Sequence, residues 1–190
     1  MFEFEVPKEV APEFDAALLS LKQLALRDEL EITQLAAPKD IAEHAIAFSA
    51  ELKSDTSEVY GKLGTGRFVL FWSPKPQENW TSNFRVVCFA RSPLETDIGR
   101  ELDGVDVTWD WLTEALSNSA AEHSALAGTT TRIISTGHGL MEHESEHAEI
   151  EIRASWSPTN TDVRRHMEAW QNLICVMSGH SIAPGVQKIA

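Results

Sequence analysis

The chain has 190 residues, with 16 Lys and Arg against 29 Asp and Glu, which gives a formal net charge of −13 at pH 7. This surplus of acid disfavours binding to nucleic acid or to anionic membranes, because both attract Lys and Arg. The longest apolar runs, residues 68–72 and 173–177, are far shorter than the roughly 20 residues that span a bilayer. We expect a single domain over residues 1–190, with a short N-terminal arm (1–9) and a C-terminal tail (180–190).

The start of the chain and its cysteines both indicate a reducing compartment. The first residues are acidic, whereas a signal peptide begins with basic residues followed by an apolar stretch. The two cysteines, Cys88 and Cys175, lie far apart in apolar segments, which is typical of buried thiols. We therefore expect a cytoplasmic protein. Because a chain of this length with 43% hydrophobic residues can bury a large core, we expect it to need neither a disulfide nor a metal ion to fold.

The first half of the chain predicts one helix followed by strands. Apolar residues recur at spacings of three and four over residues 11–27, as in an amphipathic helix. Residues 30–35 are ambiguous between helix and strand. Apolar and polar residues then alternate over 45–52, which predicts a half-buried strand. A glycine-rich loop at 61–66 leads into 67–72, which is apolar on both faces and is typical of a central strand.

The second half predicts a third strand, a helix, two more strands and a last helix. The third strand covers residues 84–91, and the helix covers 105–116. Residues 129–136 and 149–156 form the fourth and fifth strands, joined by a loop. The clearest element is the helix at 163–177, whose apolar residues step by four and three.

The order of these elements predicts an α+β fold with two layers. Short polar connections favour antiparallel pairing, so about five strands would form one antiparallel sheet with the helices on one face. The order is helix, three strands, helix, two strands, helix. It is similar to the type III secretion chaperone-like fold, whose small bacterial members are commonly homodimers. This similarity of topology implies no function by itself.

Four segments of the chain also resemble one known family. They are residues 84–91, 109–116 and 149–158 and the triplet Glu168-Ala169-Trp170, in which tryptophans and arginines follow the same order. The likeness is to the actinobacterial domain-of-unknown-function family number three thousand and covers roughly residues 10 to 186. It implies an intracellular bacterial protein with a single domain. Because the family has no established activity, it implies no functional residues.

One face of the predicted sheet is the candidate working surface. If Phe84, Val86 and Cys88 point toward the helices, then Arg85 and Phe89 point away from them. An exposed apolar stripe bordered by arginine is typical of an association surface. The alternative is that the N-terminal arm, or the loop at 73–82 with Trp80, folds across this face and buries it. The candidate partner-binding residues are Arg67, Phe71, Arg85, Phe89, Arg91 and Arg153.

The loop between the fourth and fifth strands is the one plausible metal site in the sequence. His138, His143 and His147 lie there among glutamates, and imidazole and carboxylate suit zinc or another divalent ion. The H-E-x-x-H spacing of helical zinc sites is absent. A solvated hairpin tip explains the same residues, so metal binding is a weak alternative and we predict no cofactor.

We therefore expect a non-enzymatic protein-interaction or chaperone-like module that acts as a homodimer. The acids concentrate in residues 3–15, 95–114 and 142–151, which predicts an acidic rim around an arginine-bearing sheet. That polarity suits self-association or an acidic segment of a protein partner. The alternative is a small-molecule or metal-dependent enzyme with a pocket between sheet and helices, edged by Trp109, Trp156 and Trp170.

Overall fold

The structure is a computed structural model that describes residues 1–53, 64–94, 105–141 and 147–181. Its helices are α1 (Pro12–Lys22), α3 (Val105–Asn118) and α4 (Arg164–Met177), with a short 3-10 helix η1 (Gly139–Met141). Its strands are β1 (Leu30–Leu35), β2 (His44–Leu52), β3 (Thr65–Trp72), β4 (Phe84–Leu94), β5 (His123–Ser135) and β6 (His147–Pro158). None of the described helices is long and apolar enough to cross a bilayer.

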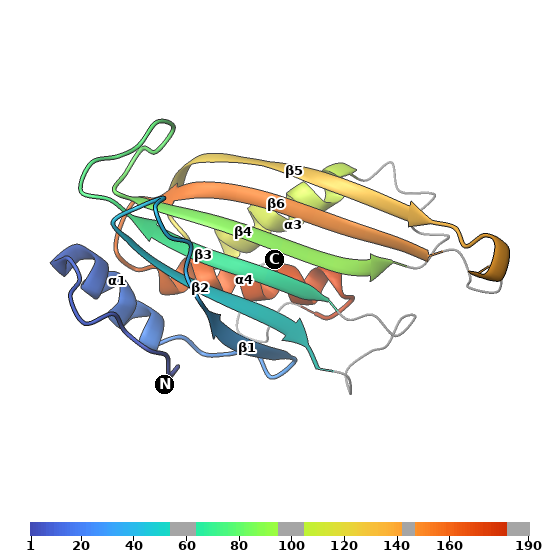
Figure 1. The fold of residues 1–190 in the computed structure, drawn as a ribbon, viewed down its shortest axis with the longest axis horizontal. Coiled ribbons are helices and arrows are strands. Elements are labelled where there is room, and N and C mark those ends of the chain that lie inside the picture. Colours follow the sequence, from blue (N-terminus) through green and yellow to red (C-terminus); the bar gives the residue numbers. More distant parts are fainter. Residues whose placement is uncertain (54–63, 95–104, 142–146, 182–190) are drawn as a thin grey trace, which may run out of the picture.

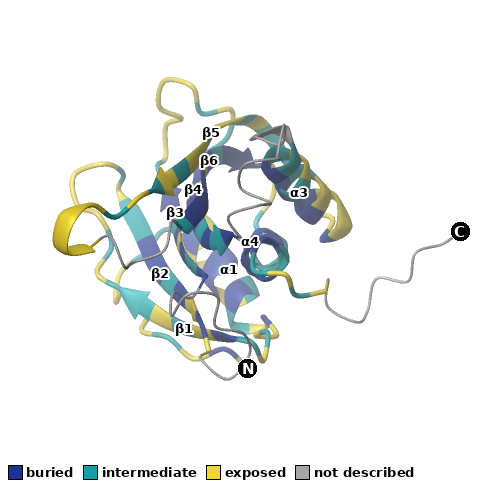
Figure 2. Ribbon diagram, turned by 90° about the vertical axis from the view of Figure 1, so that its right-hand side faces the viewer, coloured by how far each residue is buried: buried dark blue, intermediate teal, exposed yellow. Residues whose placement is uncertain are grey.

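These strands form one antiparallel sheet in the order β1-β2-β3-β4-β6-β5. In Figures 1 and 2 the helices α3 and α4 lie on one side of the sheet, and α1 packs beside α4. The predicted α+β fold with two layers is therefore confirmed. We call the sheet face opposite the helices the outer face.

The ambiguous segment at 30–35 is a sixth strand. Leu30 pairs with Leu52 of β2, and both side chains are buried on the helix side of the sheet. Glu31 and Thr33 therefore point to the outer face, since successive side chains of a strand alternate. Six residues are too few to distinguish strand from helix by periodicity, so pairing with β2 decides the structure.

The two largest boundary differences are at the end of the first helix and at the start of the fourth predicted strand. The first helix ends at Lys22 rather than Arg27, because the amides of Gln23 and Leu24 bond to carbonyls three residues back and tighten the last turn. The fourth strand begins at His123 rather than Thr129, and a bulge between Ser124 and Ala127 interrupts its register with β6. Such a bulge hides the alternating pattern on which the prediction rested.

The core lies between the helices and the inward-facing row of each strand. Phe48, Phe68, Cys88 and Ala154 are register neighbours across four strands, and all are buried. Gly66 lies under α4, and a Cβ atom there would lie 2.5 Å from Cδ1 of Ile174. Glycine at this position therefore lets the helix pack directly on β3.

The N-terminal arm packs on the helix side of the sheet. The ring of Phe2 is buried 5.3 Å from the ring of Phe48, measured between centroids, and Phe4 lies against both. The amide of Phe2 also donates to the carbonyl of Lys22 at the end of α1. The arm therefore does not cover the outer face. Of the two segments that could have buried this face, only the loop at 73–82 remains.

Candidate functional site

The outer face carries a groove that spans the middle of the sheet. It has a volume of about 700 Å³ and is lined from β1, β2, β3, β4 and β6. Val87 is 41% exposed there, and the half-buried Phe89 lies beside it on β4. Alternation along β4 produces this arrangement, because Val86, Cys88 and Ala90 point into the core. Of the two orientations that alternation allows, β4 therefore has the one in which Arg85 and Phe89 face away from the helices.

Two predicted arginines border the apolar centre of the groove. Arg67 lies directly across from Phe89 in the register of β3 and β4, and its side chain is exposed. Arg153 on β6 holds its guanidinium 5.8 Å from the centroid of the Phe89 ring, and its side chain is 69% exposed. The structure thus brings three of the six predicted partner-binding residues together around one groove.

Arg91 takes part in an ion-pair network at the edge of this groove. Its Nε lies 3.4 Å from a carboxylate oxygen of Glu151, and a terminal nitrogen lies 3.6 Å from Glu149. Arg153 also pairs with Glu151, at 2.8 Å between Nε and Oε1. The charge of Arg91 is therefore largely balanced within the chain, whereas no ion pair or hydrogen bond of Arg67 is found among the described residues.

Phe71 and Arg85 are not exposed as candidate partner-binding residues would be; they are buried by the loop at 73–82, which was the alternative considered from the sequence. The loop between β3 and β4 covers this end of the outer face, with Trp80 packed 6.3 Å from Phe71 between ring centroids. Arg85 donates to the carbonyls of Asn79 and Ala125 and to neighbouring serine hydroxyls. Burial lowers the pKa of Arg85 from its usual range. Both side chains hold the loop in place and are unavailable to a partner.

The groove has an acidic side that the sequence analysis missed. Glu31 of β1 and Glu51 of β2 are direct cross-strand neighbours, and both are exposed on the outer face. Like charges directly opposite each other destabilise a sheet, so the monomer gains nothing from this pair. The polar positions of residues 30–35 would have indicated Glu31 if that segment had been taken as a strand.

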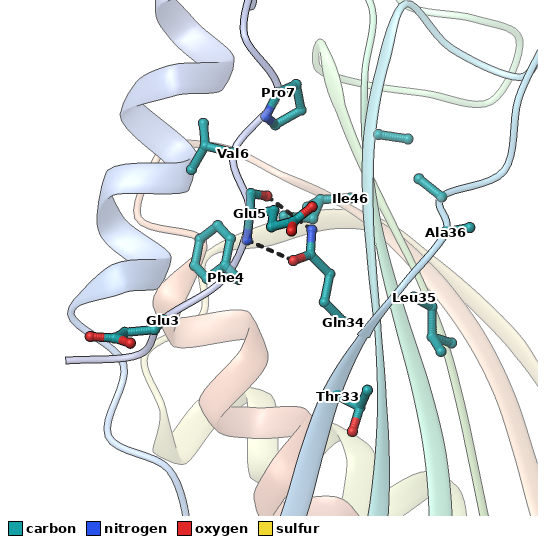
Figure 3. Close-up of a pocket in the computed structure, with 12 residues that line it drawn as sticks. Glu3, Phe4, Glu5, Val6, Pro7, Thr33, Gln34, Leu35, Ala36 and Ile46 are labelled. Carbon is teal, nitrogen blue, oxygen red and sulfur yellow. Dashed lines mark hydrogen bonds between the residues drawn. The ribbon is translucent and has the colours of Figure 1, made fainter.

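A second hollow separates the N-terminal arm from the sheet. It has a volume of about 960 Å³ and is lined by residues 3–7 of the arm and by the end of β1. Figure 3 shows Gln34 crossing this space, where its amide accepts from the backbone amide of Glu5 at 2.7 Å and donates to the carbonyl of Glu5 at 2.9 Å. Gln34 thereby hydrogen-bonds both backbone groups of Glu5, as a residue of a paired strand would.

The predicted metal ligands are only partly within the described structure. His138 and His147 flank the η1 hairpin, and His143 lies outside the described residues. Over the described parts of the chain, no group of three or more His, Cys, Asp or Glu residues is placed to hold a metal ion. Metal binding through His138, His143 and His147 stays a prediction.

The tryptophans that the enzyme alternative placed at the edge of a pocket are packing residues. Trp156 and Trp170 are fully buried, whereas Trp109 is half-buried. Trp156 donates its indole N–H to Nδ1 of His166 at 2.9 Å, and Trp170 donates to the backbone carbonyl of Phe89 at 3.1 Å. The second bond ties α4 to the strand that carries the centre of the outer groove.

The buried titratable groups are held in their neutral forms. Burial raises the pKa of the Cys88 thiol and that of the Cys175 thiol, each to about 12. Burial, with a smaller contribution from His123, lowers the pKa of His166 to about 3. A thiol in this state is a poor nucleophile, and His166 already accepts a hydrogen bond, so these groups act as core residues.

Comparisons with known proteins identify the family of this chain. No curated protein and no solved structure matches it. The model of one family matches residues 10–187, which confirms the resemblance based on the strand and tryptophan segments. The chain therefore belongs to the family described as Protein of unknown function (DUF3000).

Proposed function

We propose that this protein is a non-enzymatic protein-interaction module that acts as a homodimer through the outer face of its sheet. The observation that carries this proposal is the outer groove, in which the exposed Val87 lies beside the half-buried Phe89, and Arg67 and Arg153 flank Phe89. Aromatic and arginine side chains dominate the binding energy of protein interfaces. An apolar centre with a polar border is also the usual plan of an interface.

The chemistry of the interior supports a binding role over catalysis. The buried thiols and His166 are neutral and are shielded from solvent by the core. At one edge of the groove, Glu151 pairs with both Arg91 and Arg153. Paired charges of this kind fix the shape of a surface rather than supply an acid or a base.

A chaperone-like role and a cytoplasmic location belong to the same proposal. The chaperone-like role rests on the order of elements and on a concave apolar face that suits a protein ligand. The cytoplasmic location rests on the two cysteines, Cys88 and Cys175, which are buried free thiols rather than a disulfide. Neither carries the proposal, which stands on the outer groove alone.

Light scattering coupled to size exclusion tests the proposal. At tens of micromolar the protein should have twice the 21.1 kDa mass of one chain. Phe89→Asp should give monomers, because it places a charge in the apolar centre of the interface. The matched control is Leu19→Asp, at an apolar side chain on α1 that is 52% exposed, and it should remain a dimer.

Two outcomes would contradict the proposal. One is a wild-type protein that stays monomeric at that concentration. The other is a dimer whose dissociation is unchanged by Phe89→Asp while the variant keeps the circular dichroism spectrum of the wild type.

A further inference from the structure

The outer face has two halves of opposite charge, divided between β2 and β3. Glu31 and Glu51 lie on the β1 and β2 side, and Arg67 and Arg91 lie on the β3 and β4 side. The register places Glu31, Glu51, Thr65 and Arg91 in one row across the four strands. A surface with complementary halves can pair with a copy of itself related by a two-fold axis.

We propose that a second copy of this chain docks face to face, with the two-fold axis running along the strands between β2 and β3. The inference rests on the proposed function and names how one copy recognises the other. An axis in this position sets β1 over the partner's β4 and β2 over the partner's β3. It brings the acidic half of each copy against the basic half of the other.

The apolar residues of the face fit the same axis. Leu35, Ala47, Val69 and Val87 form a second row across β1, β2, β3 and β4. The axis sets Leu35 over the partner's Val87. Val69 is half-buried and Ala47 is only 3% exposed, so Leu35 and Val87 supply most of this apolar contact. An axis that matches charge in one row therefore matches apolar side chains in the other.

Glu51 and Arg67 are the pair that recognises the partner. Both are exposed, and neither forms an ion pair within the described residues, whereas Arg91 is already engaged by Glu149 and Glu151. Along the strands the two positions differ by two residues, or about 7 Å, and stacked sheets lie about 10 Å apart. Glutamate and arginine side chains together span that separation. The partner's arginine also relieves the repulsion between Glu31 and Glu51.

A charge exchange between two variants tests this arrangement. In Glu51→Lys alone, both copies of the contact become cation against cation, and in Arg67→Glu alone both become anion against anion. Each variant should self-associate roughly a hundredfold more weakly than the wild type, because the repulsion occurs twice in a two-fold dimer. Mixed in equal amounts, the two variants restore attraction at both contacts and should form a one-to-one heterodimer of wild-type affinity.

Sedimentation velocity of each variant alone and of the mixture gives the readout, with one variant carrying a fluorescent label. Thr131→Lys is the matched control, because Thr131 is exposed on β5, which lies outside the four strands that pair. Heterodimer formation also shows that both variants are folded.

The outcomes separate this inference from the proposed function. A wild-type dimer that Phe89→Asp dissociates, but that neither charge variant weakens, overturns the two-fold arrangement and leaves the outer face as the interface. Two monomeric variants with wild-type circular dichroism that fail to associate when mixed also overturn it. A wild-type protein that is monomeric would contradict the proposed function itself.

Discussion

The hydrogen bond between Trp156 and His166 makes the stability of this fold depend on pH. The two side chains are fully buried, and the indole N–H donates to Nδ1 of His166, which must therefore be unprotonated. Burial first, and His123 second, lower the pKa of His166 from the usual 6.5 to about 3. In the unfolded chain His166 is solvated and titrates near its usual pKa.

The sign of the pH effect follows from these two pKa values. As pH falls below 6.5, His166 becomes protonated in the unfolded chain, whereas in the folded protein it stays neutral down to about pH 3. The contribution of His166 to stability is therefore fully present above pH 6.5 and is lost progressively between pH 6.5 and 3. By linkage, protonation of the unfolded chain alone costs about 2 kcal/mol of folding free energy at about pH 5.

Urea unfolding at two pH values tests this reasoning. We compare wild type with His166→Gln, which keeps an acceptor for the Trp156 N–H and does not titrate. Between about pH 7.5 and about pH 5 the wild type should lose about 2 kcal/mol more than His166→Gln, followed by tryptophan fluorescence. His166→Leu leaves the indole N–H without an acceptor and should cost about 1–3 kcal/mol at either pH. Equal losses in wild type and His166→Gln would refute the assigned role of His166.

Three further predictions concern buried positions. Arg85→Met should lower the free energy of unfolding by about 1–3 kcal/mol, because it leaves buried carbonyl and hydroxyl acceptors unpaired; a loss within error in urea unfolding would contradict this. Gly66→Ala should cost about 1–3 kcal/mol by overpacking against Ile174, and a calorimetric melting temperature equal to that of the wild type would be inconsistent with the close approach of α4. Neither Cys88 nor Cys175 should react with a thiol reagent at about pH 8 until urea is added, since burial raises the pKa of each thiol to about 12; prompt labelling of the native protein would show that a thiol is accessible.

Local patterns in the sequence were sufficient for most elements of the fold. The four-and-three spacing of residues 163–177 predicted α4, and the alternation along β4 predicted which of its side chains share a face. Those patterns are local because the helical and strand periods act over a few neighbouring residues. For the same reason Phe89 could be placed on the same face as Arg85, opposite Val86 and Cys88, before any neighbouring strand was known.

The candidate site depends on contacts between segments that are distant in the sequence, which local patterns do not reveal. Arg85 and Phe89 share a face of β4, yet the loop around Trp80 buries the first and leaves the second in the groove. No local pattern distinguishes the two positions, because the loop reaches them from a different part of the chain. Burial of Arg85 is therefore a tertiary result.

The sequence by itself determined the fold class, the family and the alternation that sets an apolar, arginine-bearing face on β4. Only the tertiary structure decided that residues 30–35 join the sheet and set Glu31 beside Glu51, opposite in charge to Arg67. The physical reason is register: which side chains stand next to each other across strands depends on backbone pairing between distant segments. Charge complementarity on the outer face arises from that pairing.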